Sequence, residues 1–238
     1  MPVFEAGDVR IRYESWGDGP AVLLAAPGGV RSAISFWERA PWNPIEYLAD
    51  RFLVVAMDQR NAGDSLAPVR PNDGWHAYTG DQLGLMDYLG HKRFHFLGMC
   101  IGGAFGVGLV AAAPERLRSA VLLQPIGLDG NRDAFYEKFD DWAADLRAST
   151  HPDVTDEVWR RFRSNLYDGD FMFSVDRDVA RTCQVPLLVL RGNGYFHPAG
   201  ISEELVRLAP GAELVERWKD GDAVSDGRRQ VEVFLAAH

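Results

Sequence analysis

The residues with the clearest chemical potential form the segment Gly98-Met99-Cys100-Ile101-Gly102, in which two glycines flank a cysteine at fixed spacing. A short apolar run precedes this segment, and small and apolar residues at 104–113 predict a helix after it. Glycines at this spacing let a strand and a helix approach closely around one strained residue. Cys100 would then lie at a helix N-terminus, where free N–H groups and the helix dipole stabilise a thiolate or an oxyanion. The alternative is a tight turn that contains a buried, inert cysteine.

Composition limits the classes of function. The 238 residues fit one large α/β domain, with or without an insertion, and the net charge of −9 argues against nucleic acid or an anionic membrane as a partner. No apolar run is long enough to suggest a membrane span, and the N-terminal residues lack the pattern of a signal peptide, so we expect a cytoplasmic protein. The cysteines Cys100 and Cys183 fit neither a metal spacing nor a disulfide, and we expect no metal and no cofactor.

The elements that must position Cys100 follow an alternating pattern of strands and helices. Residues 9–14 alternate between apolar and polar types, as expected for a half-exposed antiparallel strand. Continuous apolar runs are typical of buried parallel strands, and they occur at 21–26, 52–57, 120–123 and 186–190. Helices are expected at 81–89, 201–208 and 226–237, with a further strand at 213–215. This order predicts a mostly parallel, doubly wound sheet covered by helices on both faces.

One section interrupts this alternation. Residues 127–182 contain no buried strand pattern and carry helical segments rich in aromatic residues. We expect a helical cap over the sheet edge where open α/β sheets bind ligands. The core would then comprise 1–126 and 183–238. Most of these aromatics are expected to pack as core, but their number favours a small apolar or aromatic substrate.

The chain resembles the α/β-hydrolase fold superfamily over nearly its whole length. Four segments carry the resemblance in the expected order, namely the elbow at Cys100, Pro27-Gly28-Gly29-Val30, the segment 57–65 and the segment 185–192. The first matches the G-x-S-x-G nucleophile elbow with cysteine in the serine position. The second occupies the place of the oxyanion loop, and the last resembles the strand that leads to the triad acid. The resemblance implies an enzyme whose substrate is a small molecule.

The resemblance also implies an oxyanion hole. One N–H group would come from Ile101 and the other from Gly29 or Val30. Arg31 and Ser32 follow directly and could reach a substrate. The alternatives are a tight glycine turn and an ordinary solvent-facing arginine.

The chain departs from the family at both remaining triad positions. The expected acid position, within 193–198, holds no carboxylate, and the expected base position, within 216–226, holds no histidine. Among the six histidines we favour His197 as the base and then His76, because both are expected in loops near the functional edge. Asp129 is the candidate acid, with capping of the first cap helix as its alternative role. Gln124, at the end of the preceding strand, is expected to bind substrate.

Three functions remain open from the sequence. The favoured one is acyl transfer, or hydrolysis of a small ester, lactone or thioester, with Cys100 as nucleophile and a lowered thiol pKa in place of a strong base. The second is lyase, isomerase or cyclase chemistry that uses the oxyanion hole to stabilise an enolate. The third is ligand binding without catalysis, because a fold does not determine a function.

Overall fold

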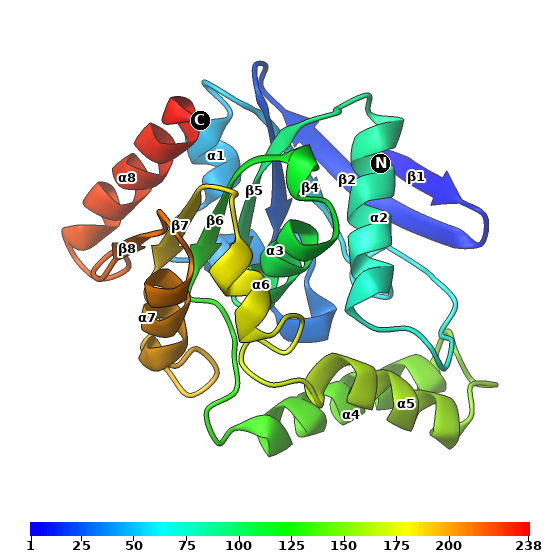
Figure 1. The fold of residues 1–238 in the computed structure, drawn as a ribbon. Coiled ribbons are helices and arrows are strands. Elements are labelled where there is room, and N and C mark those ends of the chain that lie inside the picture. Colours follow the sequence, from blue (N-terminus) through cyan, green and yellow to red (C-terminus); the bar gives the residue numbers. More distant parts are fainter.

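The computed structural model describes all residues from Met1 to His238 and has a single eight-stranded sheet with the order β1-β2-β4-β3-β5-β6-β7-β8 (Figure 1). The first two strands join the sheet in antiparallel pairing, and all other neighbouring strands are parallel. The strands are β1 (Val3–Ala6), β2 (Val9–Trp16), β3 (Ala21–Ala25), β4 (Leu53–Met57), β5 (Phe94–Met99), β6 (Leu117–Leu123), β7 (Leu187–Leu190) and β8 (Glu213–Val215). This is the α/β-hydrolase architecture that the sequence predicted.

Helices cover both faces of the sheet. They are α1 (Pro44–Leu48), α2 (Trp75–Tyr88), α3 (Ile101–Ala112), α4 (Arg132–Ala148), α5 (Asp156–Tyr167), α6 (Arg177–Thr182), α7 (Ala199–Leu208) and α8 (Ala223–Ala237). The period of two along β3 divides its side chains between two cores. Leu23 belongs to the core that also contains residues of α2, α3 and α7, whereas Leu24 belongs to the core that contains residues of α1 and α8. A strand buried on both faces must be apolar throughout, which explains the continuous runs in the sequence.

The observed elements differ from the predicted ones in extent, and one strand was not predicted. The helix expected at 81–89 begins at Trp75, because Trp75 and Tyr78 are buried and tertiary packing extends the helix through Thr79 and Gly80. The edge strand β1 was not predicted, since only Phe4 of its four residues is buried and no apolar pattern marks it. The antiparallel strand expected at 9–14 is confirmed and extends to Trp16.

Residues 127–182 form helices and loops without a strand. The helices α4 and α5 lie together at one end of the molecule, whereas α6 returns toward the sheet beside α7 (Figure 1). Edge-to-face contacts among Phe139, Trp142, Trp159 and Phe162 hold α4 to α5. Most aromatic residues of this section are therefore core, as expected. We refer to α4 and α5 as the cap, and the domain boundaries at 127 and 182 remain predictions.

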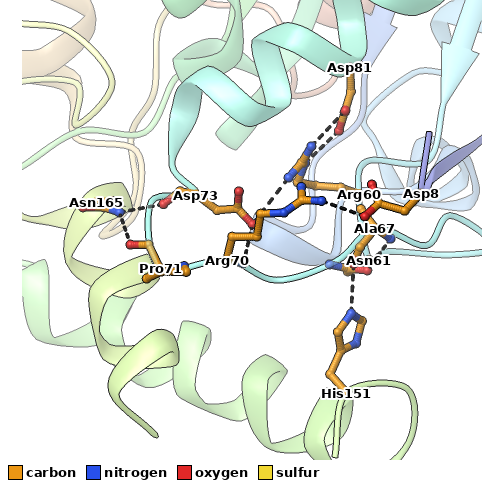
Figure 2. A network of polar contacts seen from close by, with 10 residues as sticks. All are labelled: Asp8, Arg60, Asn61, Ala67, Arg70, Pro71, Asp73, Asp81, His151 and Asn165. Atoms are coloured by element: carbon orange, nitrogen blue, oxygen red, sulfur yellow. Dashed lines mark hydrogen bonds and ion pairs between the residues drawn. The ribbon is translucent and has the colours of Figure 1, made fainter. Parts of the chain in front are cut away.

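Polar contacts attach the cap to the loop that follows β4 (Figure 2). The Asn165 side chain of α5 donates hydrogen bonds to the carbonyl oxygens of Pro71, at 3.2 Å, and Asp73, at 2.7 Å. The ring of His151, between α4 and α5, lies 2.9 Å from the carbonyl oxygen of Ala67. These contacts connect the cap to the core. None of the helices is both long enough and apolar enough to cross a membrane.

Candidate active site

The backbone around Cys100 has the predicted elbow geometry. Cys100 separates β5 from α3 and has φ 63° and ψ −117°, a conformation that side chains rarely adopt. A Cβ atom on Gly98 would lie 2.3 Å from the carbonyl oxygen of Gly102, and one on Gly102 would lie 2.4 Å from the carbonyl oxygen of Ala25. Both glycines are therefore required by the close approach of strand and helix, and they aim the Cys100 side chain away from the sheet.

The sulfur of Cys100 lies among backbone N–H groups. The backbone N–H groups of Gly28, Gly29 and Ile101 favour the thiolate and act to lower the pKa of Cys100. Burial nevertheless raises the pKa of Cys100 above its usual value, because desolvation of the thiolate outweighs the three donors. Cys100 is therefore a thiol at neutral pH. The expectation of a lowered pKa is wrong, and the site needs a base.

A cavity of about 240 Å³ lies beside the sulfur. Its lining combines the elbow, the oxyanion loop, the cap and the loop after β7, and consists of Gly28, Gly29, Val30, Arg31, Cys100, Ile101, Ile126, Phe135, Lys138, Tyr167, Phe196 and His197. The structure thus brings together the predicted nucleophile, all three predicted oxyanion-hole residues and the favoured histidine. The volume suits a small molecule, and most of the wall is apolar or aromatic.

His197 lines the cavity from the loop between β7 and α7. Two backbone hydrogen bonds with Gly194, of 2.9 and 3.1 Å, close the loop, and a Cβ atom on Gly192 would lie 2.3 Å from the His197 carbonyl oxygen. Burial, together with the charge of Lys219, lowers the pKa of His197 to about 4. Its buried Nε2 atom has no hydrogen-bond partner. His197 is therefore a neutral proton acceptor that shares the cavity with Cys100, although no hydrogen bond joins the two.

Two predicted residues lie outside this cavity. Asp129 is exposed in the turn before α4, where its own N–H group donates to the side chain of Asn131, the residue that caps the helix. An exposed carboxylate there cannot serve as the buried acid of a triad, and both roles proposed for Asp129 are wrong. His76 is exposed in the first turn of α2 and lines a separate depression with Arg161 and Asn165. Its predicted role beside Cys100 is therefore wrong too.

The structure places the three remaining predicted residues, Ser32, Arg31 and Gln124, in different surroundings. Ser32 is fully buried and donates its hydroxyl proton to the carbonyl oxygen of Ala26 at 2.6 Å, so it supports the oxyanion loop without lining the cavity. Arg31 lines the cavity, and its guanidinium forms an ion pair with Asp145 of the cap at 2.7 Å. Gln124 is buried outside the cavity, so substrate binding by Gln124 is not supported.

Sequence reasoning missed several residues of the site. Phe135 and Tyr167 of the cap, with Phe196 and Ile126, form the apolar wall. Lys219 lies in the segment where the family carries its histidine, and its Nζ donates to Gln124 Oε1 at 2.5 Å. Because the segment 216–226 holds no histidine, its other polar residues, including Lys219, were the candidates for contacts at this edge of the sheet.

Among solved structures, the fold is similar to an enol-lactonase from Burkholderia xenovorans, with a TM-score of 0.72 and 24% identity over 99% of this chain and 100% of that chain. It is also similar to a meta-cleavage product hydrolase from Pseudomonas fluorescens, with a TM-score of 0.74 and 21% identity over 100% of this chain and 98% of that chain. At these identities the structural similarity shows the fold alone.

Curated relatives align mainly with part of the chain. A protein of Azorhizobium caulinodans named as a carbamate hydrolase, RutD, is 33% identical over 52% of this chain and 44% of its own length. A 3-oxoadipate enol-lactonase of Acinetobacter baylyi is 29% identical over 57% of this chain and 51% of its own length. The chain thus spans about half the length of these relatives. The family model for the alpha/beta hydrolase fold matches residues 21–162, more than half of the 238 residues, and the chain therefore belongs to the alpha/beta hydrolase fold family.

Proposed function

We propose that the protein is an enzyme that hydrolyses or transfers the acyl group of a small activated ester, lactone or thioester through Cys100. The observation that carries this proposal is the strained Cys100 at the turn between β5 and α3, beside a cavity that also contains His197 and the backbone of Gly29 and Ile101. The names of the relatives agree with it, because they include a carbamate hydrolase and an enol-lactonase. The cavity volume of about 240 Å³ also favours a small substrate.

The first half of the reaction uses the groups in the cavity. His197 Nε2 accepts the thiol proton while the Cys100 sulfur forms a bond to the carbonyl carbon of the substrate. The electron pair of the carbonyl bond moves to its oxygen, which then accepts hydrogen bonds from the N–H groups of Gly29 and Ile101 that line the cavity. When the oxyanion collapses, the leaving group takes the proton from His197 and departs. An acyl-cysteine remains.

The second half releases the acyl group. A water molecule, or an alcohol or thiol acceptor, attacks the acyl-cysteine and gives its proton to His197. The bond between carbon and sulfur then breaks, the acyl product leaves, and His197 returns the proton to the Cys100 sulfur. The opposite pKa shifts of the two groups limit this chemistry. A thiol with a raised pKa is a weak acid, and an imidazole with a pKa of about 4 is a weak base. Proton transfer between them is therefore uphill, which favours substrates with good leaving groups over amides.

Covalent labelling tests the proposal. The protein is incubated with a panel of activated esters, lactones and thioesters, and its intact mass is measured before and during turnover. We expect one acyl adduct in the natural protein and none in Cys100→Ala. Cys183→Ala is the matched control, because Cys183 is buried outside the cavity, and it should keep the adduct. Turnover without an adduct would contradict a covalent mechanism and would favour lyase, isomerase or cyclase chemistry.

The histidine is tested separately. His197→Ala should lower the rate of acylation by about 100-fold, in the range expected for loss of general base catalysis, while the thermal unfolding temperature changes little. His91→Ala is the control, because His91 lies in the turn before β5 and outside the cavity. An unchanged acylation rate in His197→Ala would remove the histidine from the mechanism and leave the cysteine as the supported part of the proposal.

A further inference from the structure

Tyr167, the last residue of α5, is a polar residue of the cavity that the proposed reaction does not use. Its ring is packed among other aromatic rings. It stacks on Phe135 with the ring centroids 5.3 Å apart and meets Trp75 edge to face at 6.1 Å. The backbone is held as well, because Trp75 Nε1 donates to the carbonyl oxygen of Leu166 at 2.8 Å and Arg132 donates to the carbonyl oxygen of Tyr167. The position of the Tyr167 hydroxyl is therefore fixed.

This hydroxyl has no hydrogen-bond partner in the protein. Tyrosine hydroxyls usually find a partner when the ring is buried, and Tyr167 is only 2% exposed. The side-chain hydrogen bond that Tyr167 receives goes to its carbonyl oxygen and leaves the hydroxyl free. Tyr78 also has an unpartnered hydroxyl, but that atom is sealed within the core. The hydroxyl of Tyr167 is not sealed, and it opens to the cavity that Tyr167 lines together with Cys100.

The other polar side chains of the cavity already have a role or an ionic partner. Cys100 and His197 carry out the proposed reaction, in which backbone N–H groups receive the reacting carbonyl oxygen. The two cations, Arg31 and Lys138, form ion pairs with exposed carboxylates of α4 at 2.7 and 3.7 Å. The remaining side chains of the lining are apolar. Tyr167 is therefore the fixed donor that remains for a second oxygen of a bound molecule.

The Tyr167 hydroxyl is suited to donate a hydrogen bond and not to exchange a proton. Burial raises the pKa of Tyr167 well above its usual value, and the charges of Tyr78 and Cys100 act in the same direction. The phenol is therefore neutral at neutral pH and does not replace His197 as the base. A molecule that fills the cavity displaces water from this hydroxyl. If that molecule brings no acceptor, the hydroxyl stays unpaired and binding is weaker.

We propose that Tyr167 binds the substrate by donating a hydrogen bond to a second oxygen atom. The preferred substrates are then esters, lactones or thioesters whose acyl group carries an oxo or ether oxygen in addition to the reacting carbonyl. Plain alkyl esters leave the hydroxyl unpaired and are poorer substrates. The effect of Tyr167 on turnover rests on the proposed function, whereas its effect on binding does not, because binding precedes any reaction at Cys100.

Pairs of esters that differ at one oxygen test the proposal. The 4-nitrophenyl esters of 4-oxopentanoic and 5-oxohexanoic acid are compared with those of 4-methylpentanoic and 5-methylhexanoic acid, in which a methyl group replaces the oxo oxygen. We expect kcat/KM to be about 10- to 100-fold higher for at least one oxo ester, and Tyr167→Phe should remove this preference. Tyr78→Phe is the matched control, because it deletes an unpartnered hydroxyl outside the cavity and should keep the preference.

Thermal unfolding checks the premise that the hydroxyl is free. Because the Tyr167 hydroxyl has no partner in the protein, Tyr167→Phe should unfold at the same Tm as the natural protein or at a higher one. A Tm lower by several degrees would show that the protein itself holds the hydroxyl, and it would overturn the inference.

Binding measurements separate this inference from the proposed function. Dissociation constants of the corresponding methyl esters are measured by NMR titration of Cys100→Ala, which cannot be acylated at this position. We expect at least one oxo ester to bind about tenfold more tightly than its methyl analogue, and Tyr167→Phe in the same background should abolish the difference. This preference without acylation of the natural protein would support the inference while the proposed function fails. Equal binding within every pair, or a preference that survives Tyr167→Phe, would overturn the inference.

Discussion

At the scale of single residues, the site depends on backbone groups as much as on side chains. Cys100 has a positive φ, and the backbone N–H groups of Gly28, Gly29 and Ile101 act to lower the pKa of its thiol. The same N–H groups that favour a thiolate would stabilise a substrate oxyanion once the sulfur has bonded to the carbonyl carbon. Burial raises the pKa of Cys100 by more than the N–H groups lower it, so the side chain is a protonated thiol before substrate binds. Its reactivity therefore depends on a base.

The raised pKa of Cys100 predicts a pH dependence for alkylation. The thiolate is the reactive form, so the rate of iodoacetamide labelling at Cys100 should still rise with pH above 9 and show no plateau near neutrality. Labelling is followed by peptide mass spectrometry at each pH. Cys183, whose sulfur is buried and bonded to the Val185 carbonyl oxygen, is the internal reference and should react more slowly. A plateau between pH 6 and 7 would show instead that Cys100 is a thiolate.

The elbow glycines can be tested by adding one methyl group. Gly102→Ala would place a Cβ atom 2.4 Å from the Ala25 carbonyl oxygen, so we expect a loss of stability of about 2–4 kcal/mol and loss of acylation. Gly80→Ala is the matched control, because Gly80 lies within α2 with no atom near the added Cβ. The control should gain about 0.5–1 kcal/mol from its higher helix propensity. Chemical denaturation measures both, and equal stability of the two variants would contradict the close approach.

At the scale of elements, the loop after β4 links the sheet to α2 and the cap. Arg60 of this loop is buried and makes two hydrogen bonds with Asp81 of α2, at 2.7 and 2.9 Å (Figure 2). Asp73 lies 3.6 Å from the same guanidinium. Trp142 of α4 donates to the carbonyl oxygen of Asn61, the next residue in the loop, at 3.0 Å. The loop thus connects elements that are distant in sequence.

Removing the buried cation should destabilise the protein strongly. Arg60→Met leaves Asp81 and Asp73 without their partner, and breaking a buried pair in this way costs about 3–5 kcal/mol. For a chain of this size that corresponds to a decrease in Tm of roughly 10 °C. Arg10→Met is the control, because Arg10 and its partner Glu5 are exposed and such pairs contribute about 0–1 kcal/mol. Differential scanning calorimetry compares the two, and similar Tm values would show that the buried network contributes little.

At the scale of the whole molecule, two buried histidines connect stability to pH. Burial lowers the pKa of His95 to about 4, and its ring lies 2.9 Å from the Ser119 hydroxyl. His197 has a similarly lowered pKa. Because these values lie below those of the unfolded chain, the unfolded state binds protons first as the pH falls. Above about pH 6.5 the two neutral histidines contribute fully to the free energy of unfolding. This contribution decreases as the pH falls toward 4.

The slope of stability against pH tests this linkage. Between about pH 6 and 4.5, each such histidine should remove up to roughly 1.4 kcal/mol of unfolding free energy per pH unit. His95→Gln should flatten the slope by about that amount, whatever its effect on the absolute stability. Gln230→Ala is the control, because Gln230 is exposed and carries no titratable group, and it should leave the slope unchanged. Denaturant unfolding at a series of pH values gives the slope, and an unaltered slope in His95→Gln would show that His95 is protonated in the folded protein.

The sequence by itself determined the buried strands of the sheet, the turn at Cys100 and the glycine loop 27–30 beside it. Apolar runs such as 21–26 indicate strands that are buried on both faces of the sheet. The glycines around Cys100 indicate that a strand and a helix approach too closely for any residue with a Cβ atom. These features are encoded locally, within a few residues of chain. The placement of Cys100 at the turn and of Gly29 and Ile101 beside its sulfur could therefore be predicted.

Only the tertiary structure decided the rest of the site. Whether Asp129 or His197 reaches the cavity depends on how the loops from separate strand ends pack against one another. No local sequence pattern predicts this packing. The pKa of Cys100 depends on the desolvation contributed by distant cap residues as well as on its own helix N-terminus. The contact of Lys219 with Gln124 spans 95 residues of sequence. Such contacts are set by the packing of whole elements.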